Sequence, residues 1–363
     1  MNTFLSETRF RVQATKVLWI TFSWLCVSIM QFLLTYAATI QLKLDTSGLS
    51  PFEILRTSMV TGLVAGIVGG TTMVVFWERW LRSKAYSTSL LYILGTYTVI
   101  YLLVASIGSI IFQMQQLDQS FLHPAVRQAF LEDATSVAQV TVYVFWLIVV
   151  ALTLIALQIN DKYGPGVFGS FLLGKYFHPK REERIFMFLD LRGSTTIAEK
   201  LGESAYFNFL KDLFRDITPG ILDSKGEIYQ YVGDEVVISW KNTVGAAKAN
   251  CIQCYLNIQQ ILVQKSSYYQ EKYHGIVPEF KAGLHSGYVM VGEIGIVKRE
   301  IAYSGDVLNT TARIQSKCNE LGVNILLSKN LKQRLNLPKS MDIIPIGELP
   351  LRGKQEAVML YTL

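Results

Sequence analysis

Charged residues are missing from four long stretches in the first half of the sequence. Each stretch is apolar and exceeds the roughly 20 residues that a helix needs to cross about 30 Å of hydrocarbon. A set of helices buried in a protein core explains four such runs less well than a membrane domain. We therefore predict a membrane domain over residues 1–160. Its four spans are expected at Val17–Ile40, Thr57–Trp77, Ser87–Phe112 and Val137–Ile159.

Cysteine is also scarce, and its four positions argue against a disulfide framework. Cys26 lies in the first span, whereas Cys251, Cys254 and Cys318 fall in a part of the chain that is expected in the reducing cytoplasm. The spacing of Cys251 and Cys254 is that of a metal or redox pair, but no second such pair and no clustered histidine completes a site. We interpret the two residues as packed cysteines of one helix.

A strong excess of charge of one sign is absent as well. The formal net charge of +6 is too small to indicate nucleic-acid binding, so we predict no nucleic-acid partner. The four apolar stretches also contain no charge that would mark a transport path. A transporter or receptor with an accessory soluble domain is therefore a weaker interpretation.

Basic residues around the spans predict how the membrane domain is oriented. They are concentrated in the N-terminal tail, in the second connection and after the fourth span, and they mark the cytoplasmic side. We therefore expect both ends of the membrane domain in the cytoplasm. The first span starts too far from the N-terminus, and is too long, for a cleaved signal peptide. The basic residues are Arg9, Arg11 and Lys16, then Arg79, Arg82 and Lys84, then Lys162, Lys175, Lys180, Arg181 and Arg184.

Two glycine patterns occur in this half of the chain. Gly62, Gly66 and Gly70 recur at four-residue spacing in the second span, which is typical of close helix packing, within one chain or between two copies. After the fourth span, Gly164-Pro165-Gly166 interrupts the apolar pattern before a charged run. We predict a juxtamembrane connector over residues 161–183.

From Arg184 the pattern becomes that of a soluble unit, predicted over residues 184–363. Short apolar runs alternate with helical ones, which predicts an α+β fold with helices on one face of a mainly antiparallel sheet. Ser194, Thr195 and Thr196 are possible caps of the first helix. Further helices are expected at 203–217, 244–265 and 309–321, and strands near 184–191, 226–232, 235–240, 280–291, 300–303, 324–327 and 358–363.

Two aspartates stand where strands end. Asp190 closes an apolar strand, and Asp234 lies in the turn of a strand pair. If those strands are neighbours, the carboxylates meet and repel unless a cation joins them, which suggests a divalent metal site; caps or turn formers are the alternative. Gly193 and the helix start at Ser194 and Thr195 offer backbone N–H groups suited to phosphate oxygens. A nucleoside triphosphate fits both features.

Five ordered motifs in this unit resemble the catalytic domain of class III nucleotide cyclases. The resemblance covers about residues 184–363 and implies a ferredoxin-like (palm) fold. The four spans look like the membrane anchors of bacterial members, which implies attachment to the inner (plasma) membrane with the catalytic domain in the cytoplasm. The motifs are FLDLRGSTTIAEKLG, GEIYQYVGDEVVISW, AGLHSGYVMVGEIG, IAYSGDVLNTTARIQ and LPLRGK.

The resemblance implies that ATP is converted to 3′,5′-cyclic AMP and pyrophosphate. Asp190 and Asp234 match the metal-binding aspartates, with the carbonyl of Leu191 as a further ligand. Two Mg²⁺ or Mn²⁺ ions would assist attack of the ribose 3′-hydroxyl on the α-phosphorus.

The same resemblance assigns the remaining roles. Asn309 and Arg313 match the pair that orients the ribose and stabilises the transition state, although the residues alone indicate only a helix-start polar group and a solvated face. Arg352 matches a triphosphate-binding cation, with Lys354 as a close alternative. In the family the Asn/Arg pair and the metal-binding aspartates come from opposite subunits, which implies a homodimer.

The sequence departs from the family where the base is read. These positions fall on Gln230 and Ala302. Gln230 can donate and accept hydrogen bonds and could serve either purine, whereas the Ala302 side chain makes no hydrogen bond. The choice between ATP and GTP therefore stays open, with ATP favoured by the family's bacterial members. A catalytically silent nucleotide-binding sensor is a further alternative. A diguanylate cyclase is disfavoured because the doubled glycine before the aspartate is missing.

Overall fold

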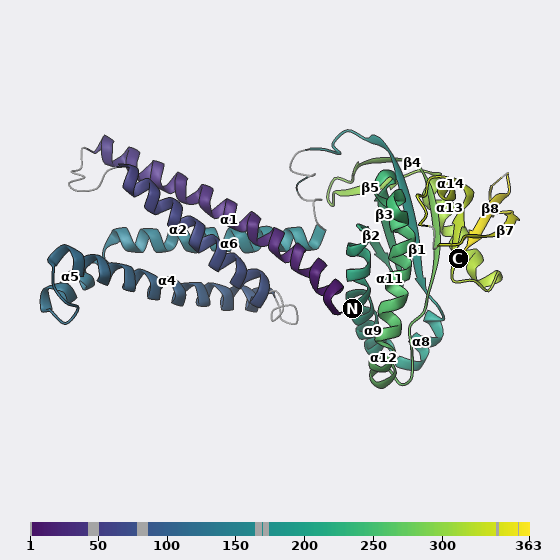
Figure 1. The fold of residues 1–363 in the computed structure, drawn as a ribbon, viewed down its shortest axis with the longest axis horizontal. Coiled ribbons are helices and arrows are strands. Elements are labelled where there is room, and N and C mark those ends of the chain that lie inside the picture. The colour runs from purple at the N-terminus through teal and green to yellow at the C-terminus, as the bar shows by residue number, and fades with distance from the viewer. Residues whose placement is uncertain are drawn as a thin grey trace. The chain divides into compact units, whose positions relative to one another are not determined.

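The computed structural model describes residues 2–42, 51–77, 86–163, 169, 174–338, 341–354 and 356–363. The chain divides into two compact units, of which one comprises Arg9–Lys162 and the other is built mainly from Tyr163–Leu363 (Figure 1).

Long helices make up the N-terminal unit. Helices with membrane-spanning length and composition occur at Val12–Gln41, Ile54–Val75, Thr88–Met114 and Val137–Asn160. They coincide with the four predicted spans. Between 11% and 33% of their apolar windows is buried, so most apolar side chains lie on the outside, as suits a lipid environment. The elements are α1 (Asn2–Gln41), α2 (Pro51–Thr71), η1 (Thr72–Trp77), α4 (Tyr86–Leu117), α5 (Pro124–Ala134) and α6 (Val137–Tyr163).

The glycine ridge of α2 packs against α1 of the same chain. A Cβ atom on Gly62 would lie 2.6 Å from Ser28 Cβ, and one on Gly66 would lie 2.6 Å from Thr21 Cα. The Ser28 hydroxyl donates a hydrogen bond to the carbonyl of Ser58 (2.6 Å), which reinforces this contact. The ridge is therefore occupied within the chain and leaves no surface for a second copy at these positions.

Some sequence predictions fall outside the described residues. These are the basic second connection with Arg79, Arg82 and Lys84, and the Gly164-Pro165-Gly166 break of the connector. Helix α5, which the sequence did not lead us to expect, begins at Pro124. The His123 ring accepts a hydrogen bond from the N–H of Ala125 (3.3 Å) at its start.

The C-terminal unit is built on one mixed sheet with helices on both faces. The described residues form eight strands in the order β2-β3-β1-β4-β6-β8-β7, with β5 paired to β4 outside this path (Figure 1). Strands β4 and β6 run parallel, and the other pairs are antiparallel. The strands are β1 (Lys180–Leu191), β2 (Glu227–Val232), β3 (Glu235–Lys241), β4 (Phe280–Ile294), β5 (Glu300–Ser304), β6 (Ile325–Ser328), β7 (Ile344–Leu349) and β8 (Val358–Thr362).

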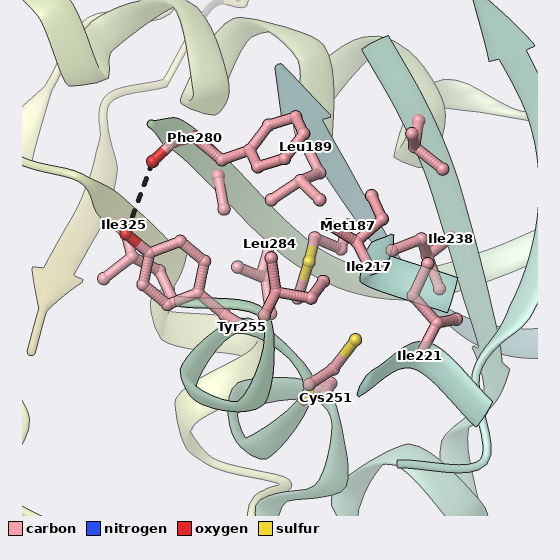
Figure 2. Close-up of a cluster of buried hydrophobic side chains, with 14 of the residues drawn as sticks. Met187, Leu189, Ile217, Ile221, Ile238, Cys251, Tyr255, Phe280, Leu284 and Ile325 are labelled. Atoms are coloured by element: carbon pink, nitrogen blue, oxygen red, sulfur yellow. Dashed lines mark hydrogen bonds between the residues drawn. The ribbon is translucent and has the colours of Figure 1, made fainter. Parts of the chain in front are cut away.

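Helices α9 and α11 cover one face of the sheet. Alternate residues of β1, β3 and β4 point into this main core, and Figure 2 shows Met187, Leu189 and Ile238 among them. Cys251 and Cys254 are fully buried there, as predicted for packed helix cysteines, and burial raises the pKa of the Cys251 thiol to about 12. The helices are α8 (Ser194–Leu201), α9 (Glu203–Asp223), α10 (Asn242–Ala246), η2 (Ala247–Ala249), α11 (Asn250–Gln264), α12 (Ser266–Lys272), α13 (Asp306–Glu320) and α14 (Lys329–Lys332).

Helix α13 packs on the opposite face, so the helices do not share one face as expected. Leu284 of β4 points toward α9 and α11, whereas its neighbour Gly283 lies directly under α13. A Cβ atom on Gly283 would lie 2.4 Å from the backbone nitrogen of Gln315. Only glycine permits this approach of helix to strand.

Two further expectations were wrong in detail. The predicted helix 244–265 is broken, because Lys248 and Ala249 adopt φ of 54° and 53° and separate α10 from α11. Strand β7 was not predicted, because Pro345 and Gly347 interrupt the alternating apolar pattern that indicates a strand. These two residues flank the register shift in the pairing of β7 with β8.

An acidic pair on α9 fixes α12. Asp212 accepts hydrogen bonds from Tyr268 (2.8 Å), Tyr273 (2.7 Å) and Lys272 (2.6 Å). On the next turn, Asp216 accepts one from Tyr269. The side chain of Asp212 is 10% exposed. Burial opposes its ionisation, but these hydrogen bonds and the charge of Arg215 hold its pKa well below the usual value.

Replacing Asp212 by asparagine is expected to loosen α12. The variant loses charge-assisted hydrogen bonds, so the free energy of opening of α12 should fall by about 1–3 kcal/mol. Hydrogen exchange of the α12 amides in the full chain measures this change. Asp342→Asn, at an exposed acid, is the matched control. Unchanged protection in the Asp212 variant would contradict the assignment.

The same contact predicts an acid dependence. Because the pKa of Asp212 is lowered in the folded state, its contribution is fully present above the unfolded pKa of about 3.9 and is lost as the pH falls further. Protection of the α12 amides should therefore fall below about pH 4, and less steeply in the asparagine variant.

Candidate active site

Acidic side chains meet where β1 ends beside the β2–β3 turn. Strands β1 and β3 are antiparallel neighbours, with Asp190 opposite Glu235. Asp234 precedes Glu235 in the turn, where Gly233 adopts a φ of 62° that favours glycine. Asp234 thus directly precedes the residue that pairs with Asp190 across the two strands. The structure therefore brings the two predicted aspartates together.

The crowding of these acids shows in their pKa values. Burial raises the pKa of Asp234, a hydrogen bond from the Ser194 hydroxyl opposes the rise, and the nearby charge of Asp190 adds to it. Burial, followed by the charges of Asp190 and Asp234, raises the pKa of Glu235 to about 7. Three acidic groups thus repel one another at this sheet end.

A lysine and a glutamine hold Asp190 in place. Lys281 lies opposite Asp190 on β4, and its Nζ is 2.9 Å from Asp190 Oδ2. Gln315 of α13 donates a hydrogen bond to the same oxygen (2.9 Å). Sequence reasoning missed Glu235, Lys281 and Gln315. Glu235 could have been found beside Asp234 in the turn, but the other two depend on strand register and helix packing.

The donor set at this sheet end fits a hard divalent cation. Carboxylate and carbonyl oxygens are the ligands that Mg²⁺ and Mn²⁺ prefer, and a cation would relieve the repulsion among the acids. No group of three or more His, Cys, Asp or Glu side chains in the described part of the chain is arranged to hold an ion. Asp190 and Asp234 would therefore need further oxygens. Leu191 ends β1 with its side chain in the core, and its carbonyl is the predicted third ligand.

The start of α8 stands beside the acids. Gly193 adopts the left-handed conformation (φ 64°, ψ 26°) ahead of the helix, and no side chain caps the helix. The proposed capping role of Ser194, Thr195 and Thr196 is therefore wrong. Instead, the Ser194 hydroxyl bonds Asp234, and the first backbone N–H groups carry no side-chain cap.

A second cluster surrounds the start of α13. Asn309 is exposed, and the Arg313 guanidinium lies beside Gly353, where a Cβ atom would be 3.3 Å from Nη2. Lys354 Nζ lies 2.5 Å from Asp306 Oδ2, and this hydrogen bond lowers the pKa of Asp306. Arg352, in the same turn, is exposed.

Helix α13 takes part in both clusters, through Gln315 beside Asp190 and through Asn309 and Arg313. Among the described residues, no hydrogen bond or ion pair connects Asp190 or Asp234 with Asn309 or Arg313. The chain thus presents an acidic half-site and a basic half-site that share no such contact among the described residues.

The two predicted base-reading residues lie on β2 and β5. The pairing of β2 with β3 shifts register between Ile228 and Gln230, and Gln230 is exposed beyond this bulge. Tyr229, which precedes Gln230, contacts Tyr303, which follows Ala302, with ring centroids 4.8 Å apart. The two strands that carry Gln230 and Ala302 are therefore joined by this tyrosine pair.

Comparison with known proteins gives a consistent result. The family model for the adenylate and guanylate cyclase catalytic domain matches residues 178–363. "Adenylate cyclase 2" of Rhizobium meliloti (strain 1021) is 36% identical over 207 residues, which are 57% of this chain and 57% of that protein. "Adenylate cyclase" of Anabaena cylindrica is 25% identical over 181 residues, which cover 48% of this chain and 35% of that protein.

The chain thus spans about half or less of the length of these curated relatives. Among solved structures, a bacterial light-regulated adenylyl cyclase matches with a TM-score of 0.53 and 20% identity, covering 63% of this chain and 66% of that one. At this identity the likeness concerns the fold, and it confirms the predicted α+β class.

Proposed function

Because the chain belongs to the adenylate and guanylate cyclase catalytic domain family, we propose that it converts ATP to 3′,5′-cyclic AMP and pyrophosphate. The observation that carries this proposal is the meeting of Asp190 and Asp234 at one sheet end, beside a helix start that no side chain caps. Carboxylates next to free backbone N–H groups suit a substrate that arrives as a metal-bound triphosphate.

The acidic half-site is the part that would bind the metal ions and the phosphates. Asp190, Asp234 and the carbonyl of Leu191 would hold two Mg²⁺ or Mn²⁺ ions, which when bound would acidify the ribose 3′-hydroxyl and neutralise the leaving pyrophosphate. Lys281 and Gln315 fix the Asp190 carboxylate from two sides. The N–H groups of Gly193, Ser194 and Thr195 would bind phosphate oxygens at the start of α8.

The basic half-site orients the ribose and stabilises charge. Asn309 and Arg313, four residues apart on α13, share one helical face. Asn309 would hydrogen-bond the ribose, and Arg313 would stabilise the negative charge that builds up at the α-phosphate. Arg352 is better available for the triphosphate than Lys354, because Lys354 pairs with Asp306.

Two half-sites that share no hydrogen bond or ion pair among the described residues of one chain support a homodimer. In a two-fold symmetric pair, the acidic half-site of one copy faces the basic half-site of the other, and two equivalent sites form. The chain itself would be divided into a membrane domain (1–160), a connector (161–183) and a catalytic domain (184–363). Four apolar helices ahead of the catalytic domain support anchoring in the inner (plasma) membrane, with the catalytic domain in the cytoplasm.

The choice of ATP over GTP rests on the relatives named adenylate cyclase. Gln230 is exposed and can serve either base, so cyclic GMP is the alternative product. The test is turnover of the full-length chain with ATP and GTP side by side, in Mg²⁺ and in Mn²⁺. Cyclic AMP as the main product supports the proposal, and cyclic GMP overturns the substrate. No product with either nucleotide would favour the silent sensor.

Replacing Asn309 by alanine, or Arg313 by lysine, is expected to lower kcat by about 10²–10³-fold with little change in KM. The reason is that both groups act mainly on charge and geometry that arise in the transition state. Steady-state kinetics with ATP measures the effect. Lys317→Arg, one turn further along α13 at a half-buried lysine, is the control. A change in KM alone would contradict the role.

A further inference from the structure

Arg184 of β1 is a buried cation that contacts both strands that carry the base-reading residues. Its side chain is 2% exposed, although it opens the apolar run of β1. Nε lies 2.9 Å from Glu182 Oε2, and Nη1 lies 2.6 Å from Glu227 Oε2. Nη1 also donates a hydrogen bond to Ser239 Oγ (3.2 Å). The guanidinium thus contacts side chains of three strands of the sheet, β1, β2 and β3.

The same guanidinium lies over an aromatic ring of β5. Its Cζ is 4.9 Å from the centroid of the Tyr303 ring, on the cation–π side. That ring also packs edge-on against Phe186 at 5.3 Å and against Tyr229 at 4.8 Å. The N–H of Tyr303 donates a hydrogen bond to the Tyr229 hydroxyl (3.4 Å).

Strands β2 and β5 do not pair with each other. Strand β2 lies at one edge of the sheet and is separated from β4 by β3 and β1, whereas β5 pairs with β4. Side chains that reach across the face of β1 are therefore the direct connection between β2 and β5. Arg184 contacts both strands, through Glu227 on β2 and through Tyr303 on β5.

The contacts of Arg184 are adjacent in sequence to the base-reading residues. Glu227 stands three residues before Gln230, and Tyr303 directly follows Ala302. Since Ala302 makes no hydrogen bond with its side chain, recognition of a base by Gln230 depends on where the two backbones lie. A shift of a few tenths of an ångström between them would change that hydrogen bond.

We propose that Arg184 is a positioning residue for nucleotide selection: it holds β2 and β5 at a fixed separation and so sets the affinity for the purine base. This inference rests on the proposed cyclase function. Arg184 touches no substrate, and its effect is exerted through Gln230 and Ala302. A purely structural role would instead affect the amount of active protein and leave the choice between nucleotides unchanged.

The test is the variant Arg184→Lys in the full-length chain. Lysine keeps the charge but lacks the planar guanidinium whose separate nitrogens bond Glu182 and Glu227 and which lies over the Tyr303 ring. We expect the ratio of kcat/KM for ATP to that for GTP to shift by about two- to tenfold, the range for weakening one hydrogen bond. The change should lie in KM, with kcat nearly unaltered.

Two further variants make the result decisive. Arg334→Lys is the matched control, because Arg334 is a partly buried arginine that pairs with Glu183 of β1 (2.8 Å). It should leave the ratio unchanged. Glu227→Gln covers the case in which Arg184→Lys fails to fold, because Glu227 is 54% exposed and its glutamine variant should fold. It should shift the ratio in the same direction by a smaller factor.

Nucleotide binding is measured separately from turnover, by titration calorimetry of the full-length chain with ATP and with GTP. If the wild-type chain turns over nucleotide but Arg184→Lys and Glu227→Gln keep its ratio and its KM values, the role of Arg184 is overturned and the proposed function stands. If the wild-type chain neither binds nor converts either nucleotide, the proposed function fails and the role of Arg184 fails with it.

Discussion

Replacing Asp190 by asparagine is expected to lower turnover by about 10²–10⁴-fold, because loss of a metal-bearing carboxylate removes several kcal/mol of transition-state stabilisation. Asparagine keeps the size of the side chain and its contact with Gln315. It removes the negative charge that pairs with Lys281 and would also bind the cation. The fold should survive, because the substitution also relieves repulsion with Asp234 and Glu235.

Two measurements check this expectation. One is the rate of cyclic AMP formation by the full-length chain at saturating ATP and Mg²⁺. The other is Mn²⁺ binding followed by electron paramagnetic resonance, which reports on the site without turnover. Asp342→Asn, at an exposed aspartate away from the cluster, should leave both unchanged. Turnover within about tenfold of wild type in the Asp190 variant would contradict the assignment of Asp190 as a metal ligand.

Mixing a chain that carries Asp190→Ala with a chain that carries Asn309→Ala is expected to restore about a quarter of wild-type activity. Each variant alone should be nearly inactive. If two copies pair at random, about half of the dimers are mixed, and each mixed dimer has one intact site of two. The prediction follows from the proposed homodimer, in which the acidic half-site of one copy faces the basic half-site of the other.

The matched control is a mixture of Asp190→Ala with Asp234→Ala chains. Both substitutions damage the acidic half-site, so no pairing yields an intact site and no activity should return. Differently tagged chains, purified on both tags in sequence, show that mixed dimers are present. An absence of rescue in demonstrated mixed dimers would place each site within one chain. Equal rescue in both mixtures would contradict the assignment of Asp190 and Asp234 to the same half-site.

The membrane domain and the catalytic fold class could be predicted from the sequence because both depend on local patterns. Four uncharged apolar runs are sufficient to identify four spanning helices, since length and hydrophobicity alone decide whether a helix suits a bilayer. Alternating apolar runs likewise located most strands of the second unit. Strand β7 was missed because Pro345 and Gly347 interrupt that pattern locally.

It was harder to predict which group a given side chain or helix contacts. Ser194 is a favourable capping residue by type, yet in the structure its hydroxyl turns to Asp234 and the helix begins uncapped. The glycine ridge of α2 predicts close packing, but the spacing of Gly62 and Gly66 does not say which helix approaches. The structure places α1 of the same chain there.

By itself, the sequence determined the four spans, the fold class and the two aspartates at strand ends, because each follows from the pattern of a single segment. Tertiary structure alone decided that Lys281 and Gln315 hold Asp190, and that Arg184 joins β2 to β5. These contacts join residues up to 125 positions apart, and they depend on strand register and on which face a helix covers. Register and packing arise from the whole chain folding at once, so no single segment encodes them.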